Sequence, residues 1–363
     1  MKGSAVGRAK ATAVPRPVDI HGLDNDLLDC LDDNIAALLR HHGVADVRSP
    51  FGCQWFFGFP PPAPQQDGRF PLPVLRHQPL SGILAAGTGF RLATPDVDAG
   101  GEERFCAEML GDGRPVIVQG DAFLMPWLPY YGRQHMNHSF IVEAAGDGVL
   151  TVADAYYNKT EWGEAAPART VLPSGALQPL AETARAAGEP PFLMLEPDGE
   201  PRPLDVAGVL RQNTEQIRAQ LGERKLMTAF SRHYADAITA PGAAERFSLA
   251  CWLIARDRAL HARWLGDLAA AANPEVDTGF AEAFTERVAA PWQQAVRFSY
   301  LLQRRIQAGK AAPDSAFRQI EHEIEPAEIE MAGLLGRAQG ADPAGPAAPA
   351  ATAPAATAPA ATS

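Results

Sequence analysis

The character of the chain changes at Leu204, and this change limits the folds that the chain can adopt. Before Leu204, short apolar runs alternate with turns rich in glycine, proline and aspartate. Long amphipathic segments follow it, at residues 204–221, 225–238, 243–272, 277–309 and 315–337. The helical spacing of their apolar residues indicates helices that each bury one face. We therefore predict an α+β domain followed by a mainly α-helical domain.

The same patterns divide the 363 residues into five parts. Residues 1–19 and the Ala/Pro/Thr-rich tail at 339–363 lack hydrophobic periodicity, so we expect both ends to be disordered. The first folded domain covers 20–165, and the helical domain covers 201–338. The stretch between them, 166–200, is polar and contains several prolines, which predicts a linker with one short helix.

Composition and charge exclude several classes of partner. The formal net charge of −11 opposes an extended nucleic-acid surface. No apolar run approaches the roughly 20 residues that a membrane helix needs, so we expect no membrane partner. The basic, alanine-rich start lacks the apolar centre of a signal peptide, which predicts a cytoplasmic protein. The cysteines lack the spacing of a zinc site or a disulfide framework, so we expect free thiols at Cys30, Cys53, Cys106 and Cys251.

A β-hairpin is predicted near the middle of the chain. Residues 139–144 and 149–153 are apolar and β-branched, and Gly146-Asp147-Gly148 between them is typical of a tight turn. His138 stands at the start of the first strand and Asp154 at the end of the second. Because these ends lie side by side in an antiparallel pair, the carboxylate can hold the imidazole in one tautomer. An incidental pair of polar residues is the alternative.

The neighbouring His135 invites a metal interpretation, which the pattern does not favour. His135 and His138 are three residues apart in the run HMNH, a spacing that places them on opposite faces of a strand. No HExxH motif or cysteine pair accompanies them, and no glycine-rich phosphate loop precedes a helix. We therefore expect neither a metal nor a cofactor.

Cys30 is the candidate nucleophile. Apolar residues at helical spacing follow it as far as the stop signal Gly43, so the thiol is expected within the first turn of a helix. A helix N-terminus favours the reactive thiolate. The charges of Asp29, Asp32 and Asp33 oppose the thiolate, and a nearby imidazolium must outweigh them. In the alternative interpretation Cys30 is a small buried apolar residue.

Weaker candidates occur in two aromatic stretches. Residues 49–80 are rich in proline, glycine and aromatic residues and contain Cys53, a rival nucleophile without a helix start behind it. Trp55 and Phe57 in this stretch are candidates for substrate binding, with packing as the more common role of such residues. Tyr130, in the run AFLMPWLPYYG, is a further candidate for substrate binding.

Three more elements are expected in the first domain. Residues 83–85 are predicted to form a short strand, and 102–110 an amphipathic helix. The run PVIVQGD predicts a buried strand that ends at Asp121.

The order of these features resembles the butirosin biosynthesis protein H family, over about residues 21–335. The resemblance is carried by Cys30 with the following LLRHHG, by GRPVIV, and by NHSFIVEA with VLTVADA. It implies a papain-like N-terminal domain and a helical C-terminal domain. It also implies acyl transfer from an acyl carrier protein, through a cysteine thioester, to an amine of a natural-product intermediate. Papain-like enzymes place an oxyanion-hole glutamine shortly before the nucleophile, and Asn25 is the candidate for that role here.

Together these observations predict an acyltransferase with a Cys30–His138–Asp154 triad. His138 would take the proton of Cys30, and the thiolate would attack a thioester carbonyl before an amine accepts the acyl group. The same residues in a cysteine peptidase, amidase or thioester hydrolase are one alternative, and a non-catalytic scaffold is another. The expected partners are an acyl carrier protein and a small-molecule amine. The long helices leave a homodimer open.

Overall fold

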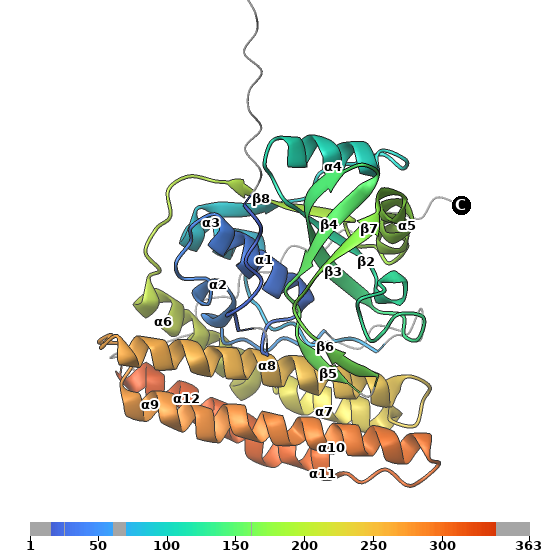
Figure 1. Ribbon diagram of the computed structural model, residues 1–363. Helices are drawn as coiled ribbons and strands as arrows, with labels where there is room; N and C mark the ends of the chain where they lie inside the picture. Colours follow the sequence, from blue (N-terminus) through green and yellow to red (C-terminus); the bar gives the residue numbers. More distant parts are fainter. Residues whose placement is uncertain (1–15, 25, 61–69, 161, 339–363) are drawn as a thin grey trace, which may run out of the picture.

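The computed structural model describes residues 16–24, 26–60, 70–160 and 162–338. A sheet flanked by helices forms one part of the molecule, and a set of long helices lies against it (Figure 1). This is a mixed fold of helices and antiparallel strands, as the sequence predicts. The predicted tail at 339–363, residues 1–15 of the predicted lead, and Asn25 lie outside the described residues.

The central sheet has six antiparallel strands, which bury apolar side chains on both faces. In spatial order the strands are β1 (Phe90–Ala93), β8 (Phe192–Pro197), β2 (Val116–Asp121), β3 (Asn137–Gly146), β4 (Val149–Asp154) and β7 (Ala168–Pro173). A separate hairpin consists of β5 (Asn158–Thr160) and β6 (Gly163–Ala165). The predicted strand that ends at Asp121 is confirmed as β2.

The predicted central hairpin is confirmed. Gly146 pairs with Val149, which leaves Asp147 and Gly148 as a two-residue turn. Both have positive φ, 52° at Asp147 and 74° at Gly148. An Asp-Gly pair tolerates this left-handed conformation, and such turns match the twist of the two strands.

Helices cover both faces of the sheet. Ile117 and Ile141 point to the face on which α1 (Cys30–His41) and α3 (Leu80–Thr88) pack. Val116 and Val118, one residue to either side of Ile117, point to the other face because side chains alternate along a strand. The helices on that face are α4 (Glu102–Gly111) and α5 (Leu177–Ala186). The predicted helix at 102–110 is thus confirmed.

The predicted helical region after Leu204 is also confirmed. Its helices are α6 (Val206–Ile217), α7 (Leu226–Ala237), α8 (Ala243–Ala270), α9 (Thr278–Phe284), α10 (Ala290–Gln307), α11 (Ser315–Gln319) and α12 (Glu325–Ala338). Short π-helical segments extend or join them at Arg218–Glu223, Thr285–Ala289 and Ile320–Ile324. In the part of the chain that the structure describes, no helix combines the length and the apolar character needed to cross a membrane.

Two predictions about the first 200 residues are wrong. Residues 83–85 lie inside α3, which ends at Gly89 with a φ of 73°, so the apolar run is helical. A run this short does not reveal its period. The expected linker at 166–200 contributes β7, α5 and β8 to the first part of the fold. Its polar composition reflects β7, which lies at the edge of the sheet and exposes alternate residues.

A buried ion pair ties the helices to the aromatic loop that follows α2 (Ser49–Gly52). The guanidinium of Arg258 on α8 donates two hydrogen bonds of 3.0 Å to the carboxylate of Glu328 on α12. Both side chains are 0% exposed. Glu328 also accepts from the indole nitrogens of Trp55, at 2.9 Å, and Trp292, at 2.8 Å. Each carboxylate oxygen therefore has two donors, as a buried charge requires.

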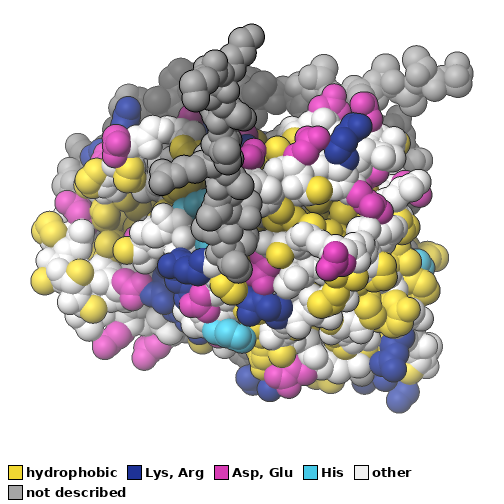
Figure 2. All heavy atoms as spheres, turned by 45° about the horizontal axis from the view of Figure 1, so that its top comes forward, with side chains coloured by type: hydrophobic (Ala, Val, Ile, Leu, Met, Phe, Trp, Pro, Cys, Tyr) yellow, Lys and Arg dark blue, Asp and Glu magenta, His cyan; other side chains and the backbone are white. Residues whose placement is uncertain are grey.

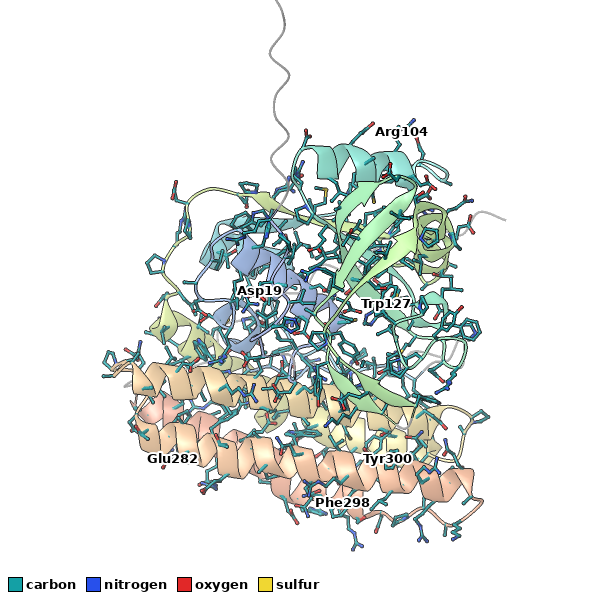
Figure 3. All side chains as sticks on the ribbon, viewed as in Figure 1. Asp19, Arg104, Trp127, Glu282, Phe298 and Tyr300 are labelled. Carbon is teal, nitrogen blue, oxygen red and sulfur yellow. The ribbon has the colours of Figure 1, made fainter. Side chains whose placement is uncertain are left out.

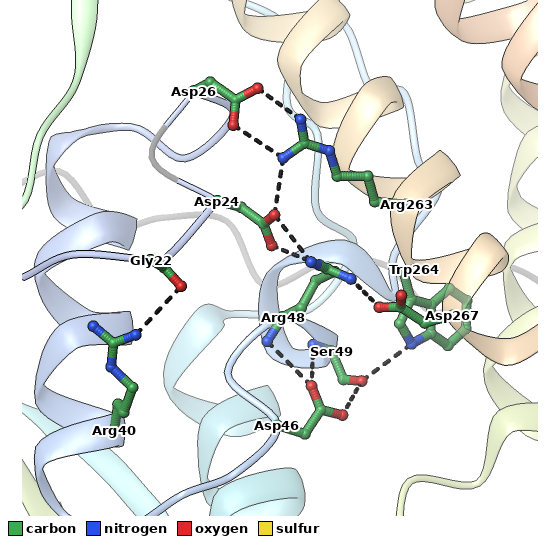
Figure 4. A network of polar contacts seen from close by, with 10 residues as sticks. All are labelled: Gly22, Asp24, Asp26, Arg40, Asp46, Arg48, Ser49, Arg263, Trp264 and Asp267. Carbon is green, nitrogen blue, oxygen red and sulfur yellow. Dashed lines mark hydrogen bonds and ion pairs between the residues drawn. The ribbon is translucent and has the colours of Figure 1, made fainter. Parts of the chain in front are cut away.

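A second network joins the two parts of the molecule near the surface (Figure 4). Arg263 on α8 bonds to Asp24 at 2.9 Å and to Asp26 at 2.6 Å. Arg48 bonds to Asp24 at 2.5 Å and also contacts Asp267 on α8. On the face shown in Figure 2, acidic and basic side chains are likewise interspersed. Solvent screens such exposed pairs, so they contribute less to stability than the buried one.

A mutation in the buried network should reduce stability more than a mutation of an exposed ion pair on the same helix. Glu328→Gln should lower the free energy of unfolding by about 3 kcal/mol, because the buried Arg258 guanidinium loses one of its two carboxylate partners and keeps only Asp257, at 2.7 Å. Glu330→Gln, two residues along α12, removes the partner of Arg287 from an exposed pair and should cost less than about 1 kcal/mol. Urea unfolding of both variants measures the difference. Equal costs would contradict the central role assigned to Glu328.

Candidate functional site

The predicted helix start at Cys30 is confirmed, and Asp29 caps it. Cys30 is the first residue of α1, and its side chain is partly buried. The Asp29 carboxylate accepts hydrogen bonds from the backbone N–H of Leu31, at 3.0 Å, and of Asp32, at 2.9 Å. The negative charge of Asp29 is therefore offset by the positive end of the helix, at which Cys30 also lies.

The other two acids of this turn oppose the thiolate less than the sequence suggests. Asp32 is buried beside Arg76, and burial raises the pKa of Asp32 to about 7 despite that contact. Asp33 is fully buried, and burial raises its pKa well above the ordinary value. Both carboxyls thus hold protons more readily than exposed aspartates do, which reduces the negative charge next to Cys30 near neutral pH.

The structure brings His138 and Asp154 together, as the predicted hairpin requires. Nε2 of His138 lies 2.8 Å from Oδ2 of Asp154, and the two side chains are 0% and 2% exposed. The same Oδ2 accepts from the indole nitrogen of Trp127 at 2.8 Å, and Oδ1 accepts from the backbone N–H of Tyr156 at 3.1 Å. Trp127 is labelled beside the sheet in Figure 3. These donors fix the carboxylate that orients the imidazole.

His138 interacts with Cys30 as well as with Asp154. Burial alone lowers the pKa of His138, but the negative charges of Asp154 and of the Cys30 thiolate, together with the hydrogen bond to Asp154, raise it to about 10. Nε2 is bonded to Asp154, and Nδ1 has no hydrogen-bond partner among the described residues, so Nδ1 is the nitrogen available to the sulfur. The order thiol, imidazole, carboxylate is that of a nucleophile, its base and the group that orients the base.

Asn34 locks the nucleophile helix onto the hairpin. Its amide nitrogen donates to the carbonyl oxygen of Cys30 at 2.7 Å and to that of Ser139 at 2.8 Å. Its amide oxygen accepts from the backbone N–H of Ala155 at 3.2 Å. Asn34 thus links α1 to β3 and to the end of β4, where the other two members of the triad lie. Sequence reasoning missed it, although a polar residue within an apolar helical stretch was a usable signal.

Two tyrosines line the same region. The rings of Tyr156 and His138 are 5.1 Å apart and nearly perpendicular. Burial raises the pKa of Tyr156, and its interaction with Tyr130 raises this pKa further. The Tyr130 hydroxyl in turn accepts from the amide of Asn158 at 3.3 Å. Tyr130, predicted as a substrate contact, therefore lies next to the triad. Tyr156 and Trp127 were missed, because nothing in their sequence context distinguishes them from core aromatics.

The remaining sequence candidates lie elsewhere. Trp55 and Phe57 are fully buried in the core of the helical region, so they have the packing role that was the alternative to substrate binding. Burial raises the pKa of the Cys53 thiol to about 12, and the pKa values of Cys106 and Cys251 rise to about 12 in the same way. All four thiols are free, and Cys30 is the one that is partly exposed. Within the described ranges, no group of three or more His, Cys, Asp or Glu side chains could hold a metal ion.

No protein-family model matches the chain, and a search of the curated proteins finds no similar sequence. A thiol at a helix start, beside a buried imidazole that a carboxylate orients, is equipped for nucleophilic attack on a carbonyl carbon.

The pKa of His138 predicts how alkylation of Cys30 depends on pH. Iodoacetate is an anion that the imidazolium attracts. The rate at which iodoacetate alkylates Cys30 should therefore fall as the pH rises through about 10 and His138 loses its proton. Asp154→Asn removes a charge that raises this pKa, so the fall should move to lower pH. The rate of alkylation by neutral iodoacetamide should fall less over the same pH range.

Asp121→Asn is the matched control for this experiment. Asp121 pairs with His135 at 2.6 Å on the surface, so its loss should leave the iodoacetate profile of Cys30 in place. A profile that Asp154→Asn does not shift would show that the carboxylate does not act on His138.

Proposed function

We propose that the protein is a papain-like cysteine acyltransferase of the butirosin biosynthesis protein H type. One observation carries the proposal: buried His138 interacts both with Cys30, at the start of a helix, and with Asp154 on the antiparallel sheet. A nucleophile helix packed against a sheet that bears the base and its orienting group is the arrangement of papain-like enzymes. The resemblance of the motifs around these residues supports the same family.

In the first half-reaction, Cys30 takes the acyl group from a carrier-protein thioester. The Cys30 thiolate attacks the thioester carbonyl, and a new carbon–sulfur bond forms. The bond to the pantetheine sulfur breaks, and the leaving thiolate takes the proton that His138 holds. One thioester replaces another, so the step is close to thermoneutral and needs no nucleotide. Cys30 is partly exposed rather than buried, as access by a pantetheine arm requires.

In the second half-reaction, His138 changes from proton donor to base. Once Cys30 is acylated, the thiolate charge that raised the pKa of His138 is gone, so the pKa falls. The neutral imidazole can then accept a proton from the incoming amine. The amine nitrogen bonds to the acyl carbon, the bond to Cys30 breaks, and the thiolate returns beside the protonated His138. Amide formation from a thioester is downhill, which drives the transfer.

The surroundings of the triad favour transfer over hydrolysis. The His138 and Asp154 side chains are almost fully buried, and Trp127 and Tyr156 pack against them, which limits access of bulk water to the base. The four free thiols are what the reducing cytoplasm maintains, so we place the enzyme there.

Intact-protein mass spectrometry tests the covalent step. After incubation with a panel of acyl-pantetheine thioesters, the native chain should gain the mass of one acyl group. Cys30→Ala should gain none and should lose turnover. Cys53→Ala should behave like the native chain, because Cys53 is buried and its thiol pKa is about 12.

Adding amines to the acylated protein then separates the two reaction classes. A product amide, formed as the adduct disappears, supports transfer, whereas free acid alone supports the hydrolase alternative. An adduct that persists in Cys30→Ala would overturn the nucleophile assignment. No adduct with any free thioester, nor with acyl carrier proteins loaded with the same groups, would favour the non-catalytic scaffold.

A further inference from the structure

A cavity of about 270 Å³ lies where the first part of the fold meets the helical region. Its walls come from the loop after α2, the turn before α3, α3 itself, and α6 with the segment that precedes it (Figure 1). The lining residues are Cys53, Gln54, His77, Gln78, Ile83, Ala86, Gly87, Arg202, Pro203, Leu204, Asp205, Val209 and Gln212. The triad is not part of this lining, so the cavity is separate from the candidate active site.

Gln54 brings an unused hydrogen-bond donor to this cavity. The side chain is 4% exposed, and its Oε1 accepts from the backbone N–H of His77 at 2.9 Å and of Gln78 at 3.3 Å. Two backbone donors identify this atom as the oxygen, so the other one is the amide nitrogen. This Nε2 is buried and has no hydrogen-bond partner in the part of the chain that the structure describes. A buried N–H group without an acceptor is costly, which favours an acceptor from a ligand.

The backbone on both sides of Gln54 is held in place by α6. The side chain of Asn213 is fully buried, and its Oδ1 accepts from the backbone N–H of Trp55 at 3.1 Å. Its Nδ2 donates to the carbonyl oxygen of Cys53 at 2.8 Å. A movement of the loop that gave Gln54 another partner would break these bonds. The free amide nitrogen is therefore a fixed feature of the cavity wall.

His77 brings a second unused polar atom to the same lining. Its Nδ1 is buried and has no hydrogen-bond partner among the described residues. Burial lowers the pKa of His77, and its interaction with Gln212 offsets only part of this effect. The imidazole is therefore neutral near pH 7, and one of its ring nitrogens is an acceptor. The lining thus offers a donor at Gln54 and, in one tautomer of His77, an acceptor.

Apolar side chains lead from this cavity to a larger one of about 600 Å³. The residues that line both cavities are Ile83, Gly87, Arg202, Pro203 and Leu204. The larger cavity adds further apolar walls, among them Pro50, Phe90 and Pro197. Because the two spaces share a wall, an aliphatic chain that starts in the smaller cavity can extend toward the larger one.

The charged residues of the smaller cavity lie at its exposed rim. Arg202 and Asp205 are both exposed, so solvent screens their charges. The carboxylate of Asp205 also caps α6 by accepting from the backbone N–H of Gly208 at 3.0 Å. The buried part of the lining is therefore uncharged, and a neutral ligand suits it better than an ion.

We propose that this cavity binds a carboxamide that carries an aliphatic chain. The carbonyl oxygen accepts from Nε2 of Gln54, and the amide N–H donates to Nδ1 of His77. The chain packs against Ile83, Leu204 and Val209. A carboxamide supplies both an acceptor and a donor without a charge. The volume is slightly below that of sites for drug-sized ligands, about 300–1,000 Å³, which suits a small amide. This inference does not depend on the proposed acyl transfer.

Calorimetric titration of the full native chain tests the proposal. Hexanamide is compared with 2-heptanone, which has the same shape but carries a methyl group in place of the amide NH₂. Hexanamide should bind about tenfold more tightly, because only the amide can donate to His77. Octanamide should bind about tenfold more tightly than hexanamide, since two further CH₂ groups leave water.

Variants separate the two polar contacts. Gln54→Met keeps a side chain of similar size but has no donor, so it should weaken the binding of hexanamide and of 2-heptanone by about tenfold each. His77→Phe keeps an aromatic ring and should lower the affinity for hexanamide to that for 2-heptanone. Gln119→Met is the matched control. Gln119 is also 4% exposed, but its Nε2 donates to the carbonyl oxygen of Pro190 at 2.7 Å, and it does not line the cavity. This variant should keep both affinities.

The measurements on the native chain decide the proposal even if a variant does not fold. Failure of both amides to bind at millimolar concentration overturns it, as does an equal affinity for hexanamide and 2-heptanone. An affinity for hexanamide that Gln54→Met leaves unchanged would place the ligand in another site, and this result also overturns the proposal. The acyl adduct on Cys30 is measured separately, so a failure here leaves the test of the proposed acyl transfer intact.

Discussion

The buried ion pair between Arg258 and Glu328 is the constraint on which the rest of the structure depends. Two charges that are shielded from solvent are stable only if each of their hydrogen-bonding groups has a partner. The indole N–H groups of Trp55 and Trp292 supply the remaining donors to the carboxylate of Glu328. That requirement fixes α8 relative to α12 and to the aromatic loop. Arg256, two residues before Arg258 on α8, donates to the carbonyl oxygen of Leu27 at 2.8 Å, three residues before Cys30. The helical region thereby shapes the site without supplying any member of the triad.

Near Cys30 the polar groups likewise have hydrogen-bond partners, and most of them are neutral or have their charge offset by a neighbouring group. The side-chain amide of Asn34 makes hydrogen bonds to three backbone groups, in α1, in β3 and at the end of β4. These bonds hold the helix that bears Cys30 against the strand that bears His138. Asp29 is neutralised by the helix terminus, and burial keeps Asp32 and Asp33 from being strongly acidic. The negative charge around Cys30 is therefore smaller than the presence of Asp29, Asp32 and Asp33 suggests.

Local patterns predicted the elements that local physics determines, and missed what depends on distant contacts. The Asp-Gly hairpin, the helix start at Cys30 and the helices after Leu204 follow from turn chemistry and periodicity, and the His138–Asp154 contact follows from the hairpin. Residues 166–200 were misinterpreted because an edge strand such as β7 exposes half of its side chains. Asn34 was missed because its role depends on hydrogen bonds to Ser139 and Ala155, more than 100 residues later in the chain, which periodicity does not record.

The loop held by Glu328 has a consequence for how the chain can be divided. Trp55 and Phe57 belong by sequence to the first part of the protein, yet they are buried in the core that the later helices build. A fragment that ends near residue 200 would carry the whole Cys30–His138–Asp154 set but would present these aromatic rings to water. During synthesis Trp55 and Phe57 are therefore made long before the helices that bury them, and their surroundings are complete only when α12, whose Glu328 accepts from Trp55, is in place.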